Sequence, residues 1–456
     1  MMSLSNLQFI FRFLPALILI YYLSPSSIRK YVLLLASLIF YALGDVRYLA
    51  LLVAAVLINY FLGKKVVDGL KNYLVYVIAF DVALLALFKA LGTFVGNSLI
   101  PVGISFYTFK MISYQIDLYK GNFKKLPDFV DTAVYFTLFA QIASGPIMRW
   151  SSYEENSSYI SRKYRLLHGS FHSRLYLIEV GLYYFCIGLI LKVMIADHLA
   201  YAWQSIGTIG YAHLSTPLAW LGVVIYSLNL YYDFWGYSLM ASGIASMLGF
   251  PFIENFHHPY AASSVSDFYR RWHMSLGSWF RDYVYIPLGG SRNGVLRNIL
   301  SLFAVWLLTG LWHGFSITFI IWAFFLLLLI LCEKFIWSRF PSIYKFVGRF
   351  HVLVLVPLSW IPFAMGKWSY LYGYLNRLFP FANIPANVFA NDYVGILQTY
   401  WPYIIVGFIG LVPIVFAAIK KFRNNIFVIL FVLVLFWISI YSLSVRQENP
   451  FMYFKF

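Results

Sequence analysis

The segment LQFIFRFLPALILIYYL (residues 7–23) opens a series of apolar stretches, and this series decides the fold class. Similar stretches follow at residues 31–43 and 48–62 and recur along the rest of the chain. A membrane-spanning helix needs about 20 predominantly apolar residues. Of the 456 residues, 61% are hydrophobic and only 11% are charged, whereas roughly a quarter of a soluble domain is charged. The sequence therefore predicts an all-α, multi-pass membrane protein.

The apolar stretches suggest about 11 spans, with an uncertainty of about two. The longest polar stretch runs only from about Arg149 to Arg174, and its Ser and Asn content is typical of a loop. No internal repeat is evident. We therefore expect one membrane-embedded domain that covers residues 1–456.

Basic residues outnumber acidic ones by 34 to 17, which gives a net charge of +17. Many of them gather in short connections between apolar stretches, as loops on the cytoplasmic side of membrane proteins do. This excess is therefore no sign of nucleic-acid binding. The two cysteines, Cys186 and Cys332, lie in apolar surroundings and are expected to be packing residues.

Several apolar stretches contain polar residues that a lipid-facing helix would not carry. Residues 101–117 resemble a buried helix, and residues 133–148 are expected to be re-entrant, because broken backbone at membrane depth needs protein or water around it. Asn229 and Asp233 lie among aromatic residues, and the span that begins near Leu175 carries Glu179, Lys192 and Asp197. Together these residues predict a polar interior.

Residues 267–285 repeat apolar side chains at a spacing of three and four, which predicts one amphipathic helix at the membrane interface. Ser266 is the expected N-cap, and Pro287 with the two glycines that follow would end the helix. A helix that only anchors the chain through Trp and Arg is the alternative. His273, beside Trp272, fits that alternative poorly.

His313 lies in the run VWLLTGLWHGFS (residues 305–316), with no carboxylate nearby in sequence. A buried neutral imidazole can take a proton from a hydroxyl group, so general-base chemistry is the natural use of this residue. A structural histidine between helices is the alternative. A zinc site would need the convergence of His257, His258, His273 and His313, whose spacing is irregular, so we expect no metal. Serine-hydrolase, nucleotide-binding and dinucleotide-binding motifs are not evident.

A set of ordered motifs lies at residues 101–109, 144–146, 229–238, 249–256, 269–276, 278–290, 311–314 and 449–456. Together these motifs resemble the membrane-bound O-acyltransferase superfamily, and most closely its bacterial polysaccharide O-acetyltransferase branch. The similarity covers nearly the whole chain, and the core motifs fall within residues 229–317.

The resemblance implies a helical bundle that encloses a tunnel, in the cytoplasmic membrane of a bacterium. A cytoplasmic acyl thioester, acetyl-CoA or an acyl carrier, would enter from one side and the acceptor from the other, with no tightly bound cofactor. By similarity, His313 is the essential histidine and His273 the second histidine of the tunnel. The residues implied to bind substrate are Asn255, Arg270, Arg271, Trp272, Trp279, Arg281, Asp282 and Trp312.

One late motif departs from the family pattern. Relatives often carry Trp followed shortly by Phe-Phe-Arg, whereas this chain reads WIPFAMGK (residues 360–367) and lacks the arginine. This difference concerns the acceptor or a partner surface and leaves the histidine motifs intact.

The resemblance predicts transfer of an acyl group, most simply acetyl, to a hydroxyl of an exported or cell-surface polysaccharide, directly or through an extracytoplasmic partner protein. His313 would act as general base or acid, while His273 and Asn255 would position the substrates or polarise the thioester carbonyl. Three alternatives remain at this point: a D-alanyl transferase for teichoic acid with a carrier-protein thioester, a lipid-linked glycan polymerase or ligase, and a multi-pass transporter.

Overall fold

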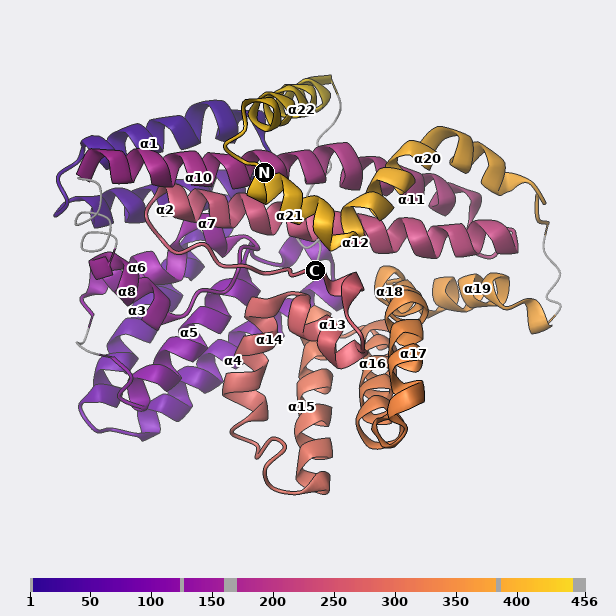
Figure 1. The fold of residues 1–456 in the computed structure, drawn as a ribbon. Helices are drawn as coiled ribbons and strands as arrows, with labels where there is room; N and C mark the ends of the chain where they lie inside the picture. Colours follow the sequence, from indigo (N-terminus) through magenta and orange to yellow (C-terminus); the bar gives the residue numbers. More distant parts are fainter. Residues whose placement is uncertain (1–2, 124–126, 160–169, 383–386, 446–456) are drawn as a thin grey trace. The chain divides into compact units, whose positions relative to one another are not determined.

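A computed structural model describes residues 3–123, 127–159, 170–382 and 387–445, and the predicted all-α class is confirmed for these residues. The only β-type pairing among them is one isolated antiparallel bridge, between Phe256 and Trp272. The motif at residues 449–456 lies outside the described part of the chain. The described residues fall into two compact units, and their helices are named by the labels of Figure 1.

The first unit comprises residues 1–189, 237–254 and 440–456. Its principal helices are α1 (Leu14–Leu23), α2 (Arg29–Asp45), α3 (Leu49–Val67), α4 (Asn72–Phe94), α5 (Ile104–Tyr119), α6 (Phe129–Thr137), α7 (Phe139–Ile142), α8 (Trp150–Tyr159) and α10 (Ser170–Ile190).

The second unit comprises residues 190–236 and 255–439. Its principal helices are α11 (Asp197–Ile209), α12 (Thr216–Met247), α13 (Val265–Arg271), α14 (Met274–Phe280), α15 (Val295–His313), α16 (Ile317–Phe335), α17 (Pro341–Phe350), α18 (Val356–Ala364), α19 (Trp368–Leu378), α20 (Asp392–Leu411), α21 (Pro413–Lys421) and α22 (Ile426–Val445). The last residues of α12 and α22 belong to the first unit.

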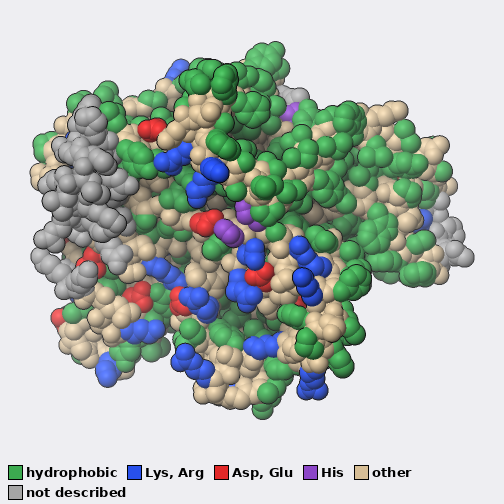
Figure 2. Space-filling model, in the orientation of Figure 1, with side chains coloured by type: hydrophobic (Ala, Val, Ile, Leu, Met, Phe, Trp, Pro, Cys, Tyr) green, Lys and Arg blue, Asp and Glu red, His purple; other side chains and the backbone are tan. Residues whose placement is uncertain are grey.

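Eight helical segments in the described residues are long and apolar enough to cross a membrane, which establishes a multi-pass membrane protein. Two further apolar helical segments, residues 9–23 and 129–142, are shorter. The expected count of about 11 spans is therefore not confirmed, and the tunnel stays a prediction. Large hydrophobic side chains are exposed along many helices, and they cover much of the face seen in Figure 2. Such surface is suited to contact with lipid.

The polar residues found in the apolar stretches meet within each unit. In the first unit, Asn59 of α3 donates to Asp81 of α4 (2.8 Å), and Gln115 of α5 donates to the backbone and side-chain oxygens of Asn59. In the second unit, the buried ammonium of Lys192 lies 2.5 Å from Asp197 and 2.9 Å from Asp233. A buried charge needs such a partner. Two buried polar networks are thus present, whereas Glu179, which was expected to contribute to the polar interior, is exposed.

Of two further expectations for the first unit, the buried helix at residues 101–117 is confirmed, and the re-entrant course of residues 133–148 stays a prediction. Helix α5 is buried along nearly its whole length, as the polar residues of 101–117 suggested. The backbone of residues 133–148 is broken: α6 ends at Thr137, Leu138 is not helical, and α7 lasts for only four residues. The buried Lys110 side chain donates to the Tyr135 carbonyl at 2.7 Å, which links α5 to this broken segment.

Helices α10 and α12 approach each other closely at Gly181 and Gly243 in the first unit. A Cβ atom on Gly243 would lie 2.6 Å from the carbonyl oxygen of Gly181, and one on Gly181 would lie 2.5 Å from that of Gly243. Small residues permit such a backbone contact between membrane helices. The hydroxyl of Tyr21 donates to the Leu248 carbonyl just beyond α12, so α1 also holds this end of the helix.

We predict that Gly243→Ala destabilises the protein by roughly 1–3 kcal/mol, because the new methyl group pushes against the backbone of α10. Gly395→Ala is the matched control, since nothing lies within 4 Å of a Cβ at that helical position. The thermal midpoint in detergent should fall for Gly243→Ala and stay unchanged or rise for Gly395→Ala. Equal midpoints for the two variants would show that α10 and α12 do not touch at these glycines.

Candidate active site

The segment that carries His273 is not one helix, so the predicted amphipathic helix over residues 267–285 is wrong. Helix α13 ends at Arg271, Trp272 is extended, and α14 starts only at Met274. His273 itself adopts a left-handed conformation, with φ 46° and ψ 54°. The N-cap is also different: Ser264, rather than Ser266, accepts the hydrogen bond from the backbone N–H of Asp267.

Tertiary hydrogen bonds explain the break between α13 and α14. The N–H of His257 donates to the Arg271 carbonyl, and the N–H of Met274 donates to the Asn255 carbonyl, each at 2.9 Å. These two bonds pair residues 255–257 with residues 271–274 in an antiparallel manner. Because they occupy backbone groups that a continuous helix would need, they override the helical spacing of the side chains.

Asn255 and His273, which the resemblance placed in the site, are in direct contact. The Oδ1 atom of Asn255 lies 3.2 Å from Nδ1 of His273 and also accepts from the backbone N–H and the hydroxyl of Ser275, at 3.1 and 2.9 Å. Asn255 and His273 are 3% and 4% exposed. Their contact is therefore a buried polar cluster in which one amide oxygen receives three hydrogen bonds.

The hydrogen bonds of Asn255 fix the tautomer of His273. A backbone N–H can only donate, so the bond from Ser275 identifies the Asn255 atom as the amide oxygen and not the nitrogen. That oxygen can only accept, hence Nδ1 of His273 carries the proton. The Nε2 atom is left with a lone pair and has no hydrogen-bond partner among the described residues. Nε2 is therefore a buried proton acceptor.

The surroundings of His273 keep the ring neutral. Burial lowers the pKa of His273 from 6.5 to about 3. The ring of Phe234 from α12 meets the imidazole edge to face, with centroids 4.6 Å apart. The Phe234 ring carries no charge and cannot solvate an imidazolium as water does. The imidazole is therefore neutral near neutral pH, with no proton on Nε2.

His313 is the last residue of α15 and lies among aromatic rings, with 6% of its surface exposed. Phe319 and Trp322 of α16 and Phe363 of α18 have ring centroids 5.8, 5.1 and 4.8 Å from the imidazole. Gly314 follows in a conformation with φ 151°, which lets the chain turn directly into α16. Helices α15 and α16 consequently form an antiparallel pair (Figure 1).

The ring of Trp312 lies near the rings of both His273 and His313. Its ring centroid lies 6.4 Å from that of His273 and 4.3 Å from that of His313. The structure therefore brings together four of the residues that the resemblance placed in the site, all from the second unit: Asn255, His273, Trp312 and His313.

Trp272 lies in an aromatic cluster next to this group. Its ring stacks on Phe268 and also contacts Phe256 and Trp360, with centroids 5.4, 5.0 and 5.0 Å away. Trp360 begins the late motif that lacks the family arginine, so this motif packs against the histidine segment. Trp272 is 4% exposed, which suits it to shaping the wall of the site more than to touching a soluble substrate.

The charged residues that the resemblance implied to bind substrate form ion pairs with neighbouring side chains. Arg270 and Arg271 pair with Asp267, and Arg281 pairs with Asp282 beside it in sequence. Trp279 is buried and contacts the rings of Phe280 and Tyr283. Their role toward a donor therefore stays a prediction.

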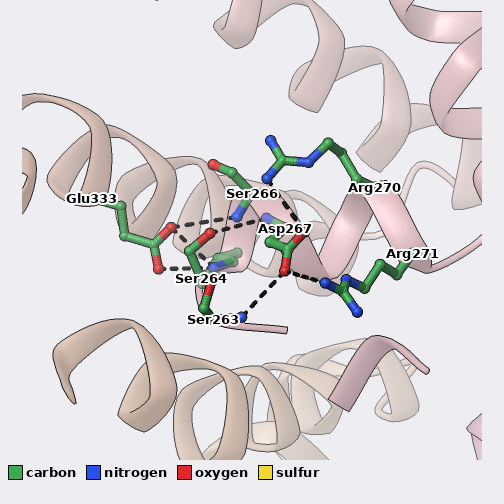
Figure 3. Close-up of polar contacts among 8 residues, drawn as sticks. Ser263, Ser264, Ser266, Asp267, Arg270, Arg271 and Glu333 are labelled. Carbon is green, nitrogen blue, oxygen red and sulfur yellow. Dashed lines mark hydrogen bonds and ion pairs between the residues drawn. The ribbon is translucent and has the colours of Figure 1, made fainter. Parts of the chain in front are cut away.

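The carboxylate of Asp267 is held in its charged form by these neighbours. Partial burial acts to raise its pKa, but the hydrogen bonds from Arg271 and the backbone of Ser263, together with the charges of Arg271 and Arg270, lower the pKa of Asp267 overall. Figure 3 shows Asp267 between the two arginines. These side chains are therefore already paired with one another on the surface.

A family model described as MBOAT, membrane-bound O-acyltransferase family, matches residues 33–376. The chain belongs to the membrane-bound O-acyltransferase family. It is therefore an acyltransferase, and the transporter and polymerase alternatives are set aside. Acyl transfer in this family implies an acyl donor and an acceptor.

Three relatives of this O-acyltransferase have named activities. A probable alginate O-acetylase of Pseudomonas putida is 32% identical, and the match covers 100% of both chains. A peptidoglycan O-acetyltransferase of Helicobacter pylori is 34% identical over 69% of this chain and 67% of its own. A teichoic acid D-alanyltransferase of Bacillus subtilis is 30% identical over 55% of this chain and 66% of its own.

One buried charge of this O-acyltransferase was not predicted from the sequence, and it lies close to the histidine segment. Glu333 of α16 is 1% exposed, accepts from the backbone N–H groups that start α13, and lies 3.0 Å from Nδ1 of His351. An acidic residue near the end of an apolar helix is costly at membrane depth, which is the signal that could have revealed it.

Among the described residues of this O-acyltransferase, no group of three or more His, Cys, Asp and Glu side chains is placed to hold a metal ion. His257 and His258 are neighbours, with ring centroids 5.6 Å apart, and His273 has its own partner in Asn255.

The low pKa of His273 makes the stability of the O-acyltransferase depend on pH. The unfolded chain takes up a proton near pH 6.5 and the folded protein does not, so stability is retained above about pH 7.5 and is lost as pH falls. For this one group the expected loss at pH 5 is about 2 kcal/mol. Thermal midpoints measured at pH 7.5 and 5 should differ less for His273→Asn than for the wild type. An equal acid shift in both proteins would contradict the neutral buried ring.

Proposed function

We propose that this enzyme moves an acyl group, most simply acetyl, from a cytoplasmic thioester to a hydroxyl of an exported or cell-surface polysaccharide, directly or through an extracytoplasmic partner protein. The observation that carries the proposal is the similarity to an alginate O-acetylase along 100% of both chains. The peptidoglycan O-acetyltransferase supports it, because the name of that relative also joins O-acetylation to a glycan.

The donor in this proposal is acetyl-CoA or an acyl carrier, used as a substrate and not held as a cofactor. The acceptor oxygen forms a bond to the acyl carbon, the C–S bond breaks, and the hydroxyl proton ends on the leaving thiolate. The reaction neither consumes nor releases a proton overall. One base that takes the proton and then returns it is therefore sufficient.

His313 and His273 divide this work in our proposal. His313 acts as the general base and acid, as the resemblance implies. Because Nδ1 of His273 carries the proton, Nε2 can only accept a hydrogen bond. This atom is therefore suited to accept one from the hydroxyl of the glycan substrate. A role for Nε2 of His273 in polarising the thioester carbonyl is disfavoured, because that role needs a hydrogen-bond donor and Nε2 carries no proton. Asn255 then acts through His273 by holding its tautomer.

A tunnel across the protein would let a cytoplasmic thioester meet an external hydroxyl without moving either one through lipid. This geometry requires the enzyme to sit in the cytoplasmic membrane of a bacterium, where thioesters are available on one side and exported glycans on the other. The apolar helices and the family support a membrane location in general.

We predict that His313→Ala lowers transfer by about 10²- to 10⁴-fold, which is the range that general acid–base catalysis contributes. The measurement is incorporation of label from radiolabelled acetyl-CoA into endogenous glycan or protein, in membranes that hold equal amounts of wild type or variant. His213→Ala is the control, because His213 lies in the exposed turn between α11 and α12. Wild-type labelling by well-inserted His313→Ala would overturn the assignment.

D-Alanyl transfer to teichoic acid from a carrier-protein thioester is the second candidate, favoured by the partial match to the D-alanyltransferase. The same membranes distinguish the two candidates when the donor is changed. Label from acetyl-CoA that depends on His313 supports the first, whereas label only from a D-alanyl carrier supports the second.

A further inference from the structure

Glu333 holds the start of the helix that leads to His273. Its two carboxylate oxygens lie 2.8 and 3.0 Å from the backbone nitrogen of Val265, and one of them lies 3.4 Å from that of Ser266. Figure 3 shows the side chain reaching from α16 to the first turn of α13. These N–H groups have no partner inside a helix, so the carboxylate satisfies donors that the short helix leaves open.

The buried charge of Glu333 is compensated from two directions. The first turn of α13 presents its N–H groups and the positive end of its helix dipole. His351, just after α17, donates from Nδ1 to Oε1 of Glu333 at 3.0 Å. A buried carboxylate is tolerated only with such partners, so replacement of either partner should disturb the other.

The chain before α13 is fixed from the same side. Arg349 of α17 donates to the Ala262 carbonyl at 2.9 Å. Gly348 lies so close to the Ser263 carbonyl that a Cβ would approach it to 2.1 Å. The segment from Ala262 to Ser266 is thereby held by α16 and α17, and it has little freedom to shift along them.

Helix α16 connects this anchor to the other histidine. Glu333 binds the start of α13, while Phe319 and Trp322 on the same helix contact the ring of His313. Helix α13 spans only Val265–Arg271, about two helical turns, and His273 follows two residues after its end. One rigid helix therefore sets the positions of both histidine segments.

We propose that Glu333 is a positioning residue for acyl transfer: by holding the first turn of α13, it fixes the direction in which Nε2 of His273 faces. This inference rests on the proposed function, because it assigns a use to His273 in the transfer. Glu333 itself does not touch the reacting atoms in this proposal. A small displacement of a catalytic group suffices for a large loss of rate.

The first test is Glu333→Gln, which keeps the size of the side chain but sets an NH₂ group among N–H donors. We expect kcat to fall about 10- to 100-fold while KM for the donor stays within about threefold, since only orientation is lost. Glu179→Gln is the matched control, because the same substitution is made at an exposed position. It should leave both constants unchanged.

The second test asks for rescue at His351. Asn can place a donor near the position of Nδ1, whereas Leu cannot, so His351→Asn should retain most of the wild-type kcat and His351→Leu should resemble Glu333→Gln. Amide hydrogen exchange supplies a readout that needs no activity. Glu333→Gln should speed exchange in residues 262–274 and leave α20 unchanged.

Three results would overturn the inference: wild-type kcat in Glu333→Gln, a loss of activity fully explained by loss of folded protein, or unchanged exchange in residues 262–274. Failure of the proposed function looks different. In that case the wild type transfers no acyl group from any thioester tested, while the faster exchange in Glu333→Gln still shows that Glu333 holds α13.

Discussion

The two backbone hydrogen bonds between residues 255–257 and 271–274 set the geometry of the histidine segment. They end α13 at Arg271, make Trp272 extended and place His273 in the left-handed region. A residue other than glycine in that region costs roughly 1–3 kcal/mol, so the surrounding contacts must over-determine it. They do so here, because Asn255 supplies both a backbone partner for Met274 and the side-chain oxygen that binds His273. Without the break, the imidazole and the amide would not meet.

The buried, proton-free Nε2 of His273 is available to a substrate hydroxyl because no described group of the protein donates a hydrogen bond to it. The Asn255 oxygen is filled by three donors, and the aromatic ring of Phe234 offers no charge to the imidazole. Water would otherwise solvate Nε2 and reduce its availability to a hydroxyl. The same reasoning applies to Lys192 with its two aspartates and to Glu333 with His351: each buried charge has partners that fix its direction.

Hydropathy and residue spacing predicted the helical membrane class, the buried character of α5 and the polar interior, since these follow from local composition. The motifs led to the family and to Asn255, His273, Trp312 and His313. The break at Trp272 and His273 was beyond local patterns, because the apolar spacing of three and four continues through it. Backbone hydrogen bonds with Asn255 and His257, which are distant in sequence, produce it. The expected count of about 11 spans is not confirmed, because eight helical segments of the described residues are long and apolar enough to cross and two further apolar segments are shorter.

The protonation of His273 tests the central claim most directly. Nitrogen-15 spectra of histidine-labelled protein in lipid, compared with those of His273→Asn, identify the two ring nitrogens of this residue. We predict a protonated Nδ1 and an unprotonated Nε2, both unchanged between pH 7.5 and pH 5. A proton on Nε2, or a charged ring at pH 5, would contradict the account, because the bond to Asn255 would then not define the proton acceptor.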